Sequence, residues 1–108
     1  MMITVGGKEY TVRPDFATIE KIEQRFDIMT FMSTIMSQRP KLSQIAWVLY
    51  SAIVVYGHEV KYEDIGNAVI EDVEGCSVTA AELLSEMVSA SPEKTGKKKA
   101  EEKEDIQK

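Results

Sequence analysis

The chain has 108 residues, of which 44% are apolar, and its formal net charge is −5. This length fits one small domain with a modest core, and no apolar run approaches the roughly 18 residues that a membrane-spanning helix needs. A single cysteine, Cys76, excludes an internal disulfide and a cysteine-pair metal site. A single histidine, His58, leaves little material for other metal chemistry.

The charge is divided unevenly along the chain. Residues 91–108 hold six lysines and five acids, so residues 1–90 have a net charge of −6, which is −5 minus +1. Nucleic acids need a clustered positive face, whereas an acidic body favours neutral or basic protein partners. We therefore expect no nucleic-acid partner. The lone cysteine and the absence of a secretory leader predict a cytoplasmic location with no membrane partner.

The first elements predicted are the two strands of a β-hairpin over residues 3–12. Two alternating runs flank Gly6-Gly7, and a two-glycine loop suits the tight turns that need positive φ. This loop places Val5 opposite Lys8 in the neighbouring strand. By the same register Ile3 faces Tyr10, and one face of the hairpin collects Ile3, Val5, Tyr10 and Val12.

Five helices are expected after the hairpin, because apolar residues then recur every three to four positions. Asp15 is the expected N-cap of the first helix, Arg39-Pro40 ends the second, and Gly57 ends the third. Thr79 and Glu82 form a capping box at the start of the last helix. The expected helices cover residues 15–26, 28–38, 41–56, 62–73 and 79–90.

The helical pattern also predicts which residues face inward. In the first helix the apolar positions are Phe16, Ile19, Ile22 and Phe26. The helix over residues 41–56 is apolar around most of its circumference, so we expect it at the centre. A buried strand is the alternative for its β-branched end near Ile53, but the length of the run favours a helix.

These elements predict a mainly helical α+β fold, with the hairpin packed on a bundle of about five short helices in a single domain, residues 1–90. Ser91-Pro92 marks its boundary. Residues 91–108 contain one large aliphatic side chain, Ile106, and cannot bury enough surface to offset the entropy of ordering. We therefore expect a disordered charged tail.

A search for catalytic groups finds no convergent set, so we expect neither an enzyme nor a cofactor or metal site. Glu63-Asp64 and Glu71-Asp72 are adjacent carboxylates on helices, where neighbours do not face each other. His58 is expected in a surface loop and Cys76 as a small filler between the last two helices. Arg13 is expected to pair with an acid of the first helix.

The methionines of the second helix are the candidates for binding a partner. Core packing is the preferred interpretation, but a short helix in so small a domain cannot easily bury two apolar sides. A side left open would be a partner surface, because unbranched thioethers adapt to varied apolar helices. The candidate partner-binding residues are Met29, Met32, Ile35 and Met36.

Several motifs together resemble the tail assembly chaperones of long-tailed phages and of gene transfer agents. They are the Gly6-Gly7 hairpin, the Arg13-Pro14-Asp15-Phe16 helix entry, and the paired Ile-Glu steps that follow it. Lys41-Leu42-Ser43 then opens a long apolar helix that runs to Gly57. The likeness covers about residues 3–90. Asp27-Ile28-Met29 departs from it, since the family more often has glycine near a shorter turn there.

The resemblance implies a non-enzymatic role in assembling the phage tail inside a bacterial host. Such proteins are thought to coat the long helical tape measure protein, keep it soluble and help tail tube subunits polymerise around it. The expected partners are thus the tape measure protein and the tail tube protein, and a homo-oligomer is compatible with this role. The alternative is a structural or adaptor module, such as a head–tail connector component.

The lysine run Lys97-Lys99 suggests a further hypothesis about the tail. Many chaperones of this type exist in short and frameshift-extended forms, and an adenine run encoding these lysines would suit ribosomal slippage. An ordinary solubilising tail is the preferred interpretation, because lysine runs are common at disordered ends.

Overall fold

The computed structural model describes residues 1–37 and 40–89 and confirms the expected mainly helical α+β fold, with an N-terminal hairpin packed on five helices. The predicted tail, residues 91–108, and the Lys97-Lys99 run lie outside the described residues. The elements in chain order are β1 (Met2–Val5), β2 (Lys8–Thr11), α1 (Phe16–Ile22), α2 (Ile28–Met36), α3 (Leu42–Tyr56), α4 (Tyr62–Glu71) and α5 (Val73–Ser89).

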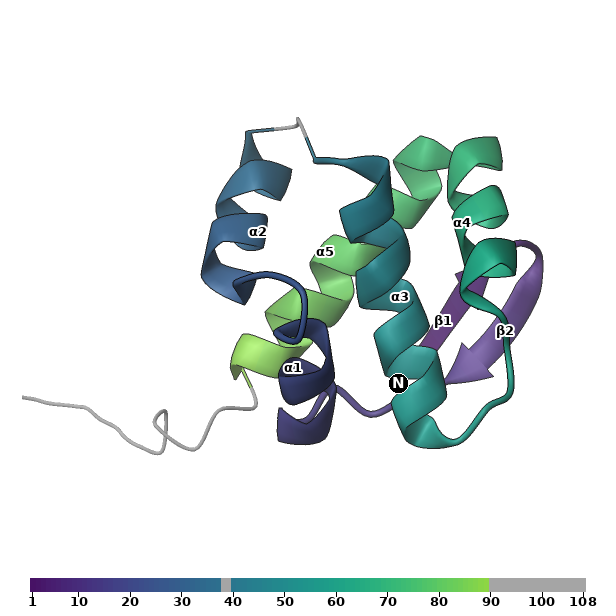
Figure 1. Ribbon diagram of the computed structural model, residues 1–108, viewed down its shortest axis with the longest axis horizontal. Coiled ribbons are helices and arrows are strands. Elements are labelled where there is room, and N and C mark those ends of the chain that lie inside the picture. Colours follow the sequence, from purple (N-terminus) through teal and green to yellow (C-terminus); the bar gives the residue numbers. More distant parts are fainter. Residues whose placement is uncertain (38–39, 90–108) are drawn as a thin grey trace, which may run out of the picture.

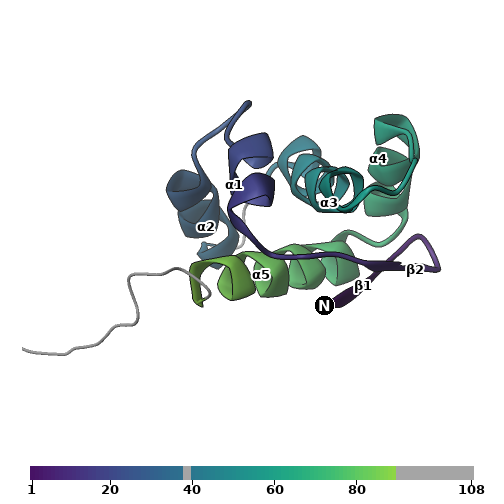
Figure 2. The same ribbon diagram turned by 90° about the horizontal axis from the view of Figure 1, so that it is seen from below.

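Helix α3 lies at the centre of the molecule, as its apolar circumference predicted. It packs against α1, α4, α5 and β2. Seen from below, α5 and the hairpin form one layer beneath α1, α3 and α4, and α2 stands at one end (Figures 1 and 2). The α3 residues that are buried are Ile45, Ala46, Trp47, Val48, Leu49, Ser51, Ala52 and Ile53. The segment near Ile53 is helical, so the strand alternative is wrong.

The hairpin has the predicted register. Val5 pairs with Lys8 and Ile3 pairs with Tyr10 in an antiparallel ladder. Gly6 and Gly7 adopt φ values of 60° and 81°, which side chains with a Cβ rarely tolerate at two successive positions. Three of the four predicted inward residues are fully buried, and Tyr10 is half-buried against the core.

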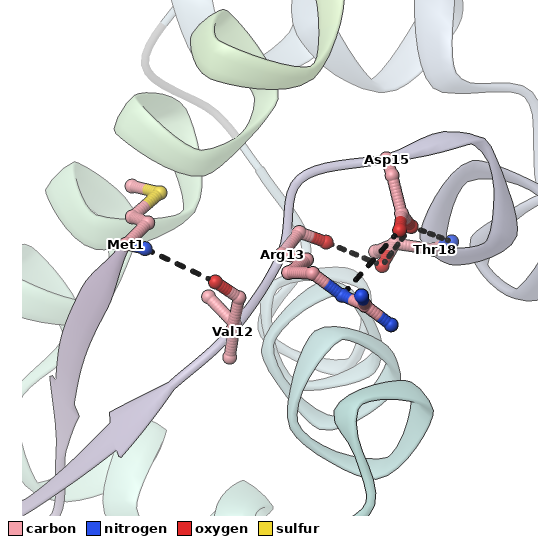
Figure 3. A network of polar contacts seen from close by, with 5 residues as sticks. All are labelled: Met1, Val12, Arg13, Asp15 and Thr18. Carbon is pink, nitrogen blue, oxygen red and sulfur yellow. Dashed lines mark hydrogen bonds and ion pairs between the residues drawn. The ribbon is translucent and has the colours of Figure 1, made fainter.

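A small polar network joins the hairpin to α1 (Figure 3). The Thr18 hydroxyl donates to the Arg13 carbonyl at 3.0 Å, and the Asp15 carboxylate accepts the Thr18 N–H at 3.3 Å. Asp15 is therefore the N-cap that the sequence predicted. Arg13 pairs with Asp15 at 3.8 Å, but both side chains are largely exposed, so this pair contributes little to stability.

His58 has a larger structural role than a surface loop would give it. It follows the C-cap Gly57, which has a φ of 123°, and its side chain is half-buried. Its Nε2 lies 2.9 Å from the Thr11 carbonyl oxygen, to which it donates. The ring stacks on Tyr56 and meets the edge of Tyr10. His58 thus fastens the end of α3 to β2.

Helix α1 is shorter than the predicted 15–26, because the chain turns after Ile22. The Ile22 carbonyl at its end accepts the indole N–H of Trp47 at 3.1 Å. The turn lets Phe26 pack against Phe31, with 5.2 Å between ring centres. Phe16 is 69% exposed, so its predicted inward position is wrong. As the first helical residue, Phe16 lies off the face that Thr18 and Ile22 turn to the core.

Helix α5 begins at Val73, so the predicted start at Thr79 is wrong, and α4 ends at Glu71 rather than at 73. The Asp72 carboxylate accepts the N–H of Gly75 at 3.1 Å and caps the first turn. Thr79 lies inside the helix, where its hydroxyl donates to the Gly75 carbonyl. Gly75 lies inside the first turn of α5, where its missing Cβ leaves room for the capping carboxylate.

Candidate partner-binding groove

An apolar groove runs between α2 and α5, and we call it the α2–α5 groove. It consists of two hollows of about 290 Å³ and about 460 Å³, and Ile35 and Ala81 line both of them. The first hollow is lined by Met32, Ile35, Met36, Ala81, Leu84, Ser85 and Val88. The second is lined by Ile35, Pro40, Val73, Glu74, Ser77, Val78 and Ala81. The shared residues show that the two hollows are adjacent along α5.

The groove stays open because α2 is anchored along one edge. Ile28 and Phe31 are 5% and 0% exposed and fix α2 to the core, where the helix packs chiefly against α5. Three other apolar side chains of α2, Met32, Ile35 and Met36, line the groove beside α5. Met36 is 81% exposed there, while Met32 and Ile35 are half-buried. The groove therefore gathers exposed apolar side chains into one patch, whereas single exposed apolar residues are common on any protein surface.

The structure brings three of the four predicted partner-binding residues together. Met32, Ile35 and Met36 form the α2 wall of the groove. Met29 is 67% exposed on the same helix but does not line either hollow. The predicted set is thus gathered on one side of the groove, with Met29 outside it.

The α5 wall was not predicted from the sequence. Its exposed members include Val78 and Val88, at 53% and 45% exposure. The signal in the sequence for this wall was a second apolar side of α5. It is formed by Val73, Val78, Ala81 and Val88. The predicted start at Thr79 left out the first six residues of α5, including Val73 and Val78, and so hid that pattern.

The charge around the groove is acidic on the α5 side. Glu74 is the charged residue among the lining residues described, and Glu82 is exposed one turn from Val78 and Ser85. Residues 62–89 carry seven acids and no lysine, arginine or histidine. Residues 28–36, which form α2, carry no charge at all. Among the described residues, the α5 side of the groove is therefore negative, and the α2 helix itself is uncharged.

The start of α2 is held by the N-cap Asp27, directly before the predicted helix start at residue 28. The Asp27 carboxylate accepts the Thr30 hydroxyl at 2.9 Å and the Thr30 N–H at 3.3 Å. The hydrogen bond from the hydroxyl is the main cause that lowers the pKa of Asp27 below its ordinary value. The charged form of Asp27 therefore stabilises the wall of the groove.

Acidification is expected to remove this cap. The pKa of Asp27 is lower in the folded state than in the unfolded state. The charged cap therefore contributes its full stabilisation above the unfolded pKa of about 3.9, and this stabilisation disappears as the pH falls through the folded pKa. We expect Asp27→Asn to lower the urea midpoint at pH 7 and to have a diminishing effect toward pH 2.5. Equal losses at both pH values would contradict a role for the charged form.

Two other clusters bring charged side chains together on the surface. Arg25 lies over the Trp47 ring at 3.9 Å, and Lys21 lies over the same ring at 4.9 Å, so these cations cover an aromatic side chain that joins α1 to α3. A third hollow of about 270 Å³ between the hairpin turn and α4 is lined partly by Lys8, Glu59 and Asp64. Neither offers the continuous apolar surface of the α2–α5 groove.

The chemistry-bearing residues do not converge in the described part of the chain. Within residues 1–37 and 40–89, no three histidine, cysteine or acidic side chains are grouped to hold a metal ion. Cys76 is buried between α4 and α5 as predicted, and burial raises the pKa of its thiol. None of the described helices is long and apolar enough to span a bilayer.

Comparisons with protein-family models, with curated proteins and with solved structures found no match for this chain.

Proposed function

We propose that this protein is a non-enzymatic tail assembly chaperone of a long-tailed phage, prophage or gene transfer agent. It acts in the cytoplasm of the bacterial host, where it binds the tape measure protein and keeps it soluble until the tail tube forms. The observation that carries the proposal is the open apolar groove between α2 and α5. The resemblance of residues 3–90 to this class of chaperones supports it.

The groove suits an extended helical partner. Amphipathic helices bind by laying their apolar stripe into a hydrophobic groove with anchors at positions i, i+3, i+4 and i+7. Met32 and Met36 provide flexible, polarisable walls that can repack around different side chains. A tape measure protein offers many such stripes along its length, and covering them removes the surface through which it would aggregate.

The acidic charge of the body would also serve a chaperone. Residues 1–90 carry a net charge of −6, which a bound chaperone would add to the surface of the complex. Like-charged complexes repel one another, and net charge far from zero favours solubility. A chaperone of this kind needs no catalytic group, so binding and charge are sufficient for the proposed role.

A charge placed in the groove should abolish the binding. We expect Met36→Glu and Met32→Glu to weaken capture of a purified tape measure fragment at least tenfold, because docking would bury an unpaired carboxylate. Met36 is 81% exposed, so its substitution should leave the fold intact. Pull-down and the soluble fraction of the co-expressed fragment measure the effect.

Ser33→Glu is the matched control, because Ser33 is exposed on the same helix and does not line the groove. This variant should capture the fragment as the wild type does. Unchanged capture by a folded Met36→Glu variant would contradict binding in the groove. Failure of the wild type to capture any tape measure fragment would overturn the chaperone proposal and favour the structural or adaptor alternative.

A further inference from the structure

We propose that the α2–α5 groove selects an amphipathic helix that carries lysine or arginine along the flank next to α5. The inference deepens the proposed function by naming the chemistry of the partner, and it rests on that function only in taking the groove as a helix-binding site. It follows from the length of the groove and from the unequal charge of its two rims.

The groove fixes the length of the bound segment. Its α5 wall extends from Val73 to Val88, a separation of about 15 residues, which corresponds to about 22 Å at 1.5 Å per helical residue. A partner helix of about four turns would cover this wall. Its apolar anchors would contact Val78, Ala81 and Leu84 on one side and Met32 and Met36 on the other.

The charges fix the orientation of the partner helix about its own axis. Glu74 lines the groove, and Glu82 is exposed one turn of α5 beyond the lining residue Val78. These two carboxylates are eight residues apart, or about 12 Å along α5. Partner cations about two turns apart on one flank could reach both of them. The opposite rim, α2, is uncharged and imposes no such requirement.

The same charges disfavour a second copy of this chain as the occupant. In a twofold dimer through the groove, each subunit would present the same patch to the other. Two copies of the acidic α5 would then be brought close together, each in a segment, residues 62–89, that holds seven acids and no base. Opposing like charges cost free energy in a contact. A basic helix from another protein meets no such repulsion.

Three synthetic helices of 18 residues test the inference against the full chain. All carry the same leucine stripe, and two flank positions seven residues apart hold lysine, glutamine or glutamate. We expect fluorescence anisotropy to give the tightest binding for the lysine peptide, about tenfold tighter than for the glutamate peptide at low salt. The difference should shrink at 0.5 M salt, because exposed charge pairs are screened.

Charge reversal in the protein should invert this order. The double variant Glu74→Lys, Glu82→Lys should bind the glutamate peptide best. Glu20→Lys, Glu63→Lys is the control, because it makes the same change of charge at exposed residues of α1 and α4 outside the groove. That control should keep the wild-type order.

Equal affinities for the three peptides, no binding of any peptide, or an order unchanged by the double variant would each overturn the inference. A wild-type dimer in light scattering that Met36→Glu dissociates would also overturn it, in favour of a second copy. These results are distinguishable from failure of the proposed function. Selective binding of the lysine peptide without capture of a tape measure fragment would refute the chaperone role and leave the inference standing.

Discussion

Replacing Trp47 with alanine is expected to lower the free energy of unfolding by about 3–5 kcal/mol, the usual loss for a buried tryptophan. Trp47 is 6% exposed at the centre of α3, and its indole N–H donates to the last carbonyl of α1 at 3.1 Å. The Arg25 guanidinium lies over the ring at 3.9 Å. The substitution would remove the packing and the hydrogen bond that hold α1 against α3.

Urea unfolding followed by circular dichroism measures this effect, because Trp47 is the only tryptophan and fluorescence would be lost with it. Trp47→Phe should cost less, since it keeps a buried ring and loses the hydrogen bond. Arg25→Ala provides a comparison that removes only the exposed cation, and we expect it to cost about 1 kcal/mol or less. A loss below about 1 kcal/mol for Trp47→Ala would show that α1 is held by other contacts.

Replacing Phe31 with alanine should have an effect of similar size, about 3–5 kcal/mol, and should also loosen α2. Phe31 is fully buried beneath α2 and packs against Phe26. It is the largest anchor of a helix whose opposite side is open to the groove. Amide exchange in α2 should therefore accelerate more than exchange in α3.

Met29→Ala is the control for this prediction, because Met29 is 67% exposed on the same helix and outside the groove. Its effect on unfolding should be within about 0.5 kcal/mol. If Phe31→Ala accelerated amide exchange equally throughout the protein, α2 would be part of the main cooperative unit. Phe31 would then stabilise the whole fold rather than α2 in particular.

The sequence was informative where local rules decide the structure. Gly6-Gly7 determined the turn and with it the strand register, because a one-residue slip would expose the apolar face of the hairpin. Asp15 and Asp27 marked helix starts, and Gly57 marked a helix end. The position of α3 at the centre followed from its apolar circumference.

Local rules failed where two signals competed for the same helix end. Asp72 and Thr79 are both good N-caps, and Gly75 between them reads as a helix terminator. The tertiary structure decides for Asp72, because a continuous α5 buries both Cys76 and Ala80 against the neighbouring helices. Phe16 was misplaced because the helical face depends on what the helix packs against.

Only one wall of the candidate groove could be predicted from the sequence, because the other wall depends on how the helices pack together. The open side of α2 could be inferred from its methionines, since a short helix in a small domain has little to cover two apolar sides. The opposite wall depends on α5 lying beside α2, although the two helices are separated by about 36 residues of sequence. No local pattern states that pairing, so Ala81, Leu84 and Val88 could not be assigned to a site.

The most direct test of a helix-binding groove uses the six methionine methyl groups as probes. The full chain would carry labelled methionine methyls and would be titrated with a purified tape measure fragment while methyl NMR spectra are recorded. We predict that Met32 and Met36 shift or broaden, whereas Met1 and Met2 at the hairpin stay unchanged. Shifts confined to Met1 and Met2, or no shift at a saturating concentration, would contradict binding in the α2–α5 groove.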